Sequence, residues 1–159
     1  MEQTKFVELV KSFTENIPSG NEVEIPPGLD RVSFEIQGSN CTIFPHPEED
    51  AVVVQAEVVY VNRLDPEPGF VAGMAVHGIN YAARLNTGIV ATVSPDNLLL
   101  VSKVCDATQM SGDNLVDAVG IVSDAAQRIR QIWKEILETY ALEAGSAVEE
   151  EPPNLMTRV

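Results

Sequence analysis

Basic residues are scarce in this chain. Its 159 residues include 10 Lys and Arg against 24 Asp and Glu, which gives a formal net charge of −14. Nucleic-acid binders neutralise phosphates with Lys and Arg, and proteins that dock on anionic membranes use the same side chains. The composition therefore argues against nucleic acid and membrane as partners. A neutral or basic protein is the expected partner instead.

Long hydrophobic runs are missing as well. The most apolar segment, 51–61, contains Glu57 and is far shorter than the about 20 residues that a membrane-spanning helix needs. The opening MEQTKFVELV has an acid at its second position and no apolar core of signal-peptide length. The only two cysteines, Cys41 and Cys105, are typical of a reducing compartment, where they act as small buried apolar groups. We therefore expect a cytoplasmic protein.

Motifs for catalysis or metal binding do not occur in the sequence. The two histidines, His46 and His77, are far apart, and neither lies in a ligand pattern such as HExxH or CxxC. No nucleophile elbow and no glycine-rich phosphate loop are present. The acidic run 48–50 lies in a predicted turn, where a solvated loop is favoured over a metal site. We expect no enzyme activity, no cofactor and no metal.

Apolar periodicity in the first part of the chain predicts one helix and three strands. Residues 4–17 repeat apolar side chains at the spacing of one helical face. Residues 32–36 alternate apolar and polar, as a half-buried strand does. A turn over 38–40 leads to strands over 41–45 and 51–61. Connections this short favour an antiparallel meander.

The second part of the chain predicts a helix, a hairpin and a long helix. Residues 70–85 have helical length, and strands over 89–93 and 98–104 flank a type I turn. Ser111 or Asp113 can cap the last helix. Its apolar residues recur at alternating spacings of four and three: Leu115, Val119, Val122, Ala126, Ile129, Trp133, Ile136 and Tyr140.

These elements predict the fold class and the extent of the domain. The order helix, three strands, helix, two strands, helix indicates an α+β fold with an antiparallel sheet packed with helices. One domain over 1–142 accounts for all of the periodic segments. The acidic segment 143–159 has few side chains that can form a core, and we expect it to be a disordered tail.

The strand 51–61 carries apolar side chains on both faces. One face is wholly apolar, and the other begins with Val53 and ends with Val59 and Val61. The outer face of an antiparallel sheet usually meets water, so these extra residues predict a partner-binding patch. The alternative is that the strand is central and covered on both sides by the same chain.

The helix 70–85 has a stripe of mostly small residues. Glycine inside a helix costs about 1 kcal/mol relative to alanine, so it calls for a packing reason. Small side chains allow close approach of another backbone, and the opposite side of this helix is also largely apolar. A homodimer contact is one interpretation, and packing on the terminal helix of the same chain is the other. The stripe consists of Val71, Ala75, Gly78, Ala82 and Leu85.

The order and spacing of five segments resemble a known family. The segments are FVELVKSF, SFEIQGSNCTIF, INYAARLNTG, IVATVSPDNLLLVSKV and AQRIRQIWKEIL. Over residues 4–142 the chain resembles the class I type III secretion chaperones, the Tir-chaperone family of Gram-negative bacteria. It departs from that family in its middle helix, which is rich in alanine and glycine where members usually carry leucine.

The resemblance implies a function without catalysis. It implies a homodimer in the bacterial cytosol that binds the N-terminal segment of secreted effectors and keeps it competent for export. Dimer contacts would lie on the middle helix and the following hairpin, and effector contacts on the first helix and the sheet. The alternative is a regulatory or protein-interaction module of the same fold, similar to sensory regulators.

An extended client segment can pair with a sheet edge and place alternate side chains in apolar hollows. The candidates for this effector contact are the apolar residues of the first helix and of the strands. They are Phe6, Val10, Phe13, Val32, Phe34, Ile36, Phe44, Val53 and Val59. The alternative is that all of them belong to the core.

Overall fold

A computed structural model describes residues 1–17, 30–61, 73, 76–78, 80 and 88–147, with side chains of the last helix described as far as Thr139. Two helices and five strands lie in the described ranges. They are α1 (Gln3–Asn16), β1 (Val32–Ile36), β2 (Ser39–Pro45), β3 (Ala51–Tyr60), β4 (Ile89–Val93), β5 (Leu98–Asp106) and α3 (Gly112–Ala147). The predicted order of elements and the α+β class are confirmed.

The predicted middle helix is described in part. Residues 73, 76–78 and 80 are helical, and the remainder of 70–85 lies outside the described residues. Helix α3 continues to Ala147, past the point where the sequence predicts the acidic tail to begin. Residues 148–159 lie outside the described residues.

The strands form one antiparallel sheet in the order β1-β2-β3-β5-β4. The first three strands are the predicted meander, and the β4–β5 hairpin joins it through β5. Cross-strand partners place Val54 beside Ile43 on one side and Lys103 on the other. The two edges of the sheet are therefore β1 and β4.

The turn between β1 and β2 differs from the predicted one. The sequence predicts a turn over 38–40, but Ser39 and Asn40 belong to β2 and the turn consists of Gln37 and Gly38. Both turn residues have positive φ, 51° and 71°, as a two-residue hairpin turn that follows the strand twist requires. The amide Nε2 of Gln127 in α3 donates to the carbonyl oxygen of Gln37 at 2.9 Å. This contact ties the turn to the helix.

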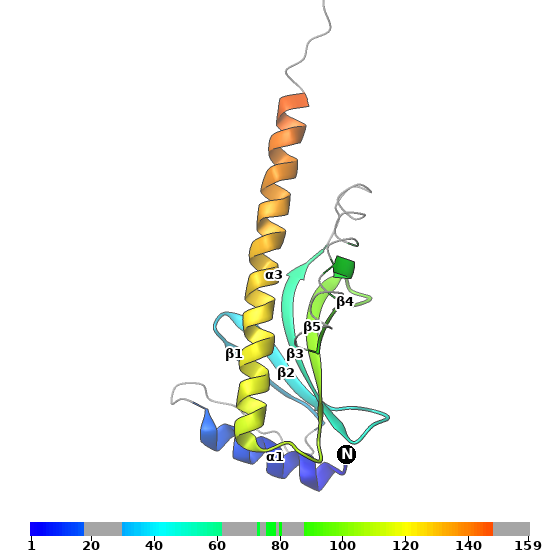
Figure 1. The fold of residues 1–159 in the computed structure, drawn as a ribbon, viewed down its shortest axis with the longest axis vertical. Helices are drawn as coiled ribbons and strands as arrows, with labels where there is room; N and C mark the ends of the chain where they lie inside the picture. The colour runs from blue at the N-terminus through cyan, green and yellow to red at the C-terminus, as the bar shows by residue number, and fades with distance from the viewer. Residues whose placement is uncertain (18–29, 62–72, 74–75, 79, 81–87, 148–159) are drawn as a thin grey trace, which may run out of the picture.

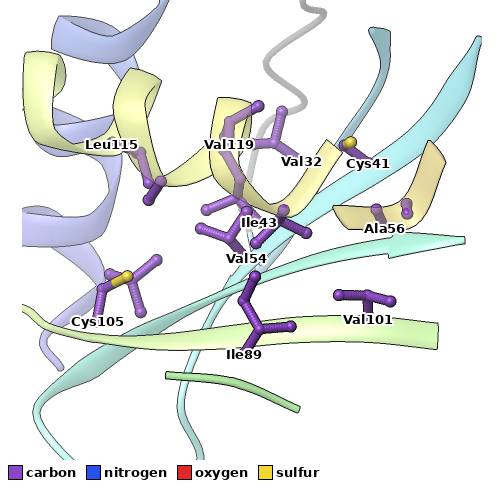
Figure 2. Close-up of a cluster of buried hydrophobic side chains, with 14 of the residues drawn as sticks. Val32, Cys41, Ile43, Val54, Ala56, Ile89, Val101, Cys105, Leu115 and Val119 are labelled. Carbon is purple, nitrogen blue, oxygen red and sulfur yellow. The ribbon is translucent and has the colours of Figure 1, made fainter. Parts of the chain in front are cut away.

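Helix α3 lies along one face of the sheet, and α1 crosses below its N-terminal end (Figure 1). Figure 2 shows Leu115 and Val119 of α3 directed at Ile43, Val54 and other sheet residues. The predicted apolar stripe of α3 is buried from Leu115 to Trp133, and Ile136 is half-buried. Phe6, Val10 and Phe13 of α1 are buried in the same core.

The start of α3 is capped and packed closely on α1. Ser111 Oγ accepts a hydrogen bond from the Asn114 amide at 3.2 Å and donates to Asn114 Oδ1 at 2.6 Å. Ser111 is therefore the N-cap, and Asp113 follows in the first turn, where an acid favours the helix dipole. Gly112 lies against the backbone of Ser12 in α1. Only a residue without a Cβ allows this approach.

Candidate partner-binding surfaces

The first-helix candidates are inside the core. Phe6 and Val10 are fully buried, and Phe13 is 1% exposed. The Phe13 ring lies 5.4 Å from the ring of Phe34 on β1, centroid to centroid. Phe13 therefore packs against Phe34 from the core side, and the Phe34 side chain is itself partly exposed to solvent.

Three of the predicted effector-contact residues, Val32, Phe34 and Ile36, lie on the edge strand β1. Val32 is buried, whereas Phe34 and Ile36 are half-buried and pack on the core from the side of the helices. We call Phe34 and Ile36 the edge pair. They lie on the strand whose outer side meets no other described strand. An added strand at this edge would bring its side chains directly beside them.

The sheet face away from α3 carries a second apolar surface. Phe44, Val53 and Val104 are directly opposite one another across β2, β3 and β5. Val90 of β4 pairs with Ser102, which places it diagonally beside Val104. Phe44 is half-buried, Val104 is 50% exposed and Val90 is 42% exposed, whereas Val53, between Phe44 and Val104, is buried at 7% exposed. We call Phe44, Val53, Val90 and Val104 the outer-face patch.

Polar side chains border the outer-face patch. The Ser33 and Thr42 hydroxyls are hydrogen-bonded at 3.0 Å across β1 and β2. Asn40 Nδ2 donates to Glu57 Oε2 at 3.0 Å. Val59 and Val61 do not lie on this face as the alternation of 51–61 predicts. Beyond an irregularity in the β3–β5 register, Val59 pairs with the buried Leu99, and both valines pack on the core. The patch is therefore bounded toward β1 by polar groups that already have partners.

The sequence predicted part of the outer-face patch. It named Phe44 and Val53 but omitted Val90 and Val104. The alternation in the hairpin was visible, but which face each residue occupies depends on the pairing of β3 with β5. That pairing joins strands distant in sequence, and periodicity alone does not determine it.

One of the five predicted dimer residues lies in the described part of the chain. Gly78 is exposed, and a Cβ added there would meet no atom within 4 Å. Val71, Ala75, Ala82 and Leu85 lie outside the described residues. The dimer contact therefore stays a prediction.

Reactive groups in the described residues have structural surroundings. Both cysteines are buried as free thiols. Burial raises the pKa of the Cys41 thiol to about 11, and the nearby Glu57 carboxylate acts in the same direction. Burial also raises the pKa of Cys105, while Lys103 opposes that shift. These thiols are protonated near neutral pH and therefore weak nucleophiles.

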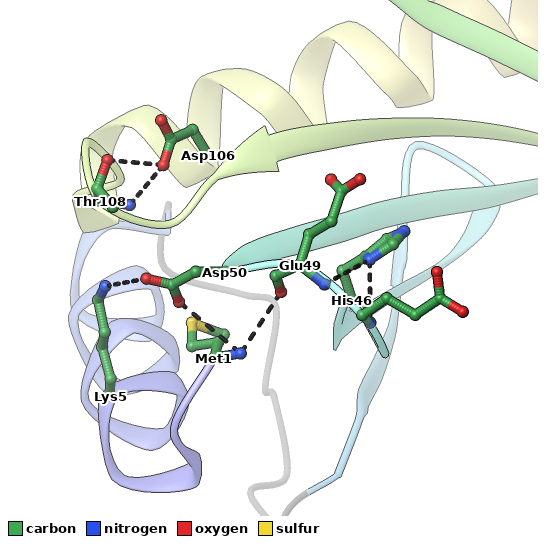
Figure 3. Close-up of polar contacts among 8 residues, drawn as sticks. Met1, Lys5, His46, Glu49, Asp50, Asp106 and Thr108 are labelled. Atoms are coloured by element: carbon green, nitrogen blue, oxygen red, sulfur yellow. Dashed lines mark hydrogen bonds and ion pairs between the residues drawn. The ribbon is translucent and has the colours of Figure 1, made fainter.

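The polar contacts around His46 and Asp50 serve the local structure (Figure 3). His46 Nδ1 accepts hydrogen bonds from the backbone amides of Glu48 and Glu49 at 3.3 and 3.1 Å, which shapes the β2–β3 turn. Lys5 Nζ pairs with Asp50 Oδ2 at 3.3 Å and joins α1 to that turn. Within the described residues there is no group of three or more His, Cys, Asp or Glu that could hold a metal.

Asp106, at the end of β5, accepts two hydrogen bonds from Thr108. The Thr108 hydroxyl donates at 2.7 Å and the Thr108 amide at 2.8 Å. These bonds lower the pKa of the Asp106 carboxyl. Together with the capped start of α3, they fix the loop that leads from the sheet into the helix.

None of the helices, over the part that the structure describes, is long and apolar enough to cross a membrane.

Solved structures that resemble this fold include three complexes of two proteins. A structure of the ExsC–ExsE complex matches with a TM-score of 0.60 at 10% identity, over 82% of this chain and 93% of that one. The HopA1–SchA chaperone–effector complex matches with a TM-score of 0.59 at 10% identity, over 82% and 98%. The Yersinia pestis type III secretion chaperone SycH, in complex with a stable fragment of YscM2, matches with a TM-score of 0.48 at 15% identity, over 78% and 98%.

The sequence itself matches no family model and no curated protein. The likeness is therefore one of structure, and at these identities it shows the fold. The helix, the five-stranded antiparallel sheet and the long C-terminal helix make an α+β fold that matches the ExsC–ExsE and HopA1–SchA structures.

Proposed function

We propose that this chain is a cytosolic chaperone that binds the N-terminal segment of type III secreted effector proteins and keeps that segment competent for export. The observation that carries the proposal is the fold, which this chain shares over 82% of its length with the HopA1–SchA chaperone–effector complex. The partner class comes from that complex and from the family resemblance of the sequence.

The two apolar surfaces support an extended protein segment as the ligand. The edge pair, Phe34 and Ile36, borders the open backbone of an edge strand. An extended segment added to β1 would pair its backbone with the strand and place alternate side chains beside these two residues. The outer-face patch offers a second apolar contact, around Phe44 and Val104.

The buried members of the predicted site contribute indirectly. Phe13 supports Phe34 from below at 5.4 Å, and Val32 anchors β1 to the core. Truncating either would lower the stability of the fold by more than truncating the half-buried Phe34 or Phe44, each of which is expected to leave the chain folded and remove client contact. The proposal therefore places the client on the half-buried candidates Phe34, Ile36, Phe44 and Val59, adds the exposed Val90 and Val104, and leaves out the buried Val53.

The rest of the proposed function involves no chemical step. The chain acts by binding, without catalysis, cofactor or metal. We propose a homodimer built on the stripe of 70–85, which would present two client surfaces in one assembly.

The experiment is affinity co-purification of the tagged chain from its native host, followed by mass spectrometry and then by binding assays with truncated forms of each captured protein. The expected result is a captured protein whose N-terminal segment alone binds, and whose form without that segment does not. Capture of a protein that binds only when folded, through a region other than its N-terminus, would contradict the chaperone proposal and favour the regulatory module.

A further inference from the structure

Strand β4 is an edge strand without the usual protection. It borders β5 and no other described strand. Its sequence, IVATV, has no charge and no proline, and four of its five residues are β-branched. Val90 and Val93 are 42% and 48% exposed. Edge strands of this composition pair readily with other extended chains, and proteins usually block them with lysine, proline or a bulge.

The side chain of Asn80 occupies the backbone edge of β4. Asn80 Nδ2 donates to the carbonyl oxygen of Ala91 at 2.8 Å, and the Ala91 amide donates to Asn80 Oδ1. In an antiparallel ladder, alternate residues direct both backbone groups away from the partner strand. Ala91 is such a residue. The side-chain amide of Asn80 makes the same two hydrogen bonds to the Ala91 backbone that an added strand would make.

The opposite edge of the sheet differs. The β1 backbone receives no hydrogen bond from a side chain elsewhere in the described part of the chain. The Ser33 hydroxyl bonds inward, to Thr42 of β2. One edge is therefore closed by a side chain at its central residue, and the other carries no such closure among the described residues.

We propose that Asn80 is a specificity-determining residue that closes the β4 edge to strand addition, so that an extended polypeptide segment pairs with β1. The identity of that segment as an effector rests on the proposed function, whereas the closure of β4 does not. Without Asn80, the occupant of the β4 edge is a second copy of this chain. Two uncharged IVATV strands then pair antiparallel, free of the acidic side chains that make two copies repel elsewhere.

Asn80→Ala tests the closure by sedimentation velocity over a concentration series. The natural chain is expected to keep one assembly size, and Asn80→Ala to form larger assemblies as its concentration rises. Adding Val90→Lys should reverse this association, because an edge lysine opposes strand pairing. Adding Val104→Lys is the matched control, since Val104 is as exposed but lies on β5, and association should persist.

Amide hydrogen exchange supplies a second measurement. Exchange of the Ala91 amide should rise about tenfold in dilute Asn80→Ala, since one hydrogen bond is lost. Asn80→Asp retains the acceptor and should leave this amide protected while losing the bond to the Ala91 carbonyl. An Asn80→Ala variant of unchanged size, with Ala91 still protected, would overturn the proposal. Unfolding of both variants would overturn it too, because Asn80 would then determine the fold.

The client step is tested separately. A captured client segment should protect β1 amides in the natural chain and should also protect β4 amides in Asn80→Ala. Protection of β4 in the natural chain would overturn the assignment of edges. A chain that self-associates on loss of Asn80 but has no extended client supports the closure and contradicts only the proposed function.

Discussion

Arg130 of α3 donates from Nε to the carbonyl oxygen of Val58 at 2.9 Å, although 72 residues separate the two in sequence. Its Nη2 reaches the carbonyl oxygen of Glu57 at 3.1 Å and Ser39 Oγ at 3.4 Å. The β3–β5 register shifts between Glu57 and Val59. A bulge frees backbone groups from the ladder, and the guanidinium takes up the carbonyls at this one.

Arg130→Met should therefore destabilise the chain. The substitution keeps the apolar stem but leaves two half-buried carbonyls without their donor, a loss of about 1–3 kcal/mol in the free energy of unfolding. Urea denaturation followed by circular dichroism measures the change. The control is Arg128→Met, since Arg128 is exposed on the same helix and its replacement should change the free energy little. Equal effects of the two variants would contradict this role of Arg130.

Gly112→Ala should lower stability even though alanine is the better helix former. The new Cβ would lie 2.7 Å from the Ser12 backbone carbon and oxygen, so α1 or the start of α3 has to shift. Overpacking of this kind costs about 1–3 kcal/mol. Gly120→Ala is the matched control, because it lies in the same helix with no atom within 4 Å of an added Cβ. That variant should raise the melting temperature, since alanine gains up to about 1 kcal/mol over glycine in a helix.

Cys41 should make stability fall at alkaline pH. Its pKa rises from 9.0 to about 11 in the folded chain, chiefly through burial. The unfolded thiol ionises first as pH rises above 9, which stabilises the unfolded state, so the contribution is complete below 9 and lost as pH approaches 11. Between pH 8 and pH 10 the free energy of unfolding should drop by up to about 1 kcal/mol from this group. Cys41→Ala should show a smaller drop in urea denaturation at the two pH values.

Gly78→Arg tests the proposed dimer. Gly78 is exposed with open space around it, so a single subunit should accept the side chain without loss of helix content. At a dimer contact the same charge would be buried without a partner, which costs several kcal/mol and should give a monomer in light scattering. The control is Gly73→Arg, which is also exposed but lies off the stripe, and it should remain dimeric. A natural chain that is monomeric would contradict the proposal.

Local patterns predicted most of the fold. The strands, the stripe from Leu115 to Trp133 and the cap at Ser111 follow from periodicity and helix-end chemistry, which depend on neighbouring residues. The turn at Gln37 was missed because glutamine rarely takes positive φ, and Gly38 with Ser39 and Asn40 is typical of a turn. Its position depends on the pairing of Ile36 with Ser39.

Long-range contacts account for the parts of the site that the sequence could not predict. The bond from Asn80 to Ala91 depends on where Asn80 lies relative to the edge strand β4, 11 residues later in the sequence. Phe13 is buried and Phe34 is partly exposed, and this difference depends on how α1 and β1 pack in the folded chain. Both residues have the same apolar character in the sequence, and only their packing distinguishes them.

The most direct test of the proposed function is isothermal titration calorimetry. It measures the affinity of a captured client's N-terminal segment for the natural chain and for three variants. Phe34→Ser and Phe44→Ser should each weaken binding by about tenfold or more, because each removes a large apolar contact. Ile132→Ser, which removes an apolar side chain 46% exposed on α3, should bind as the natural chain does. Equal affinity for all four proteins, each folded by circular dichroism, would contradict the account.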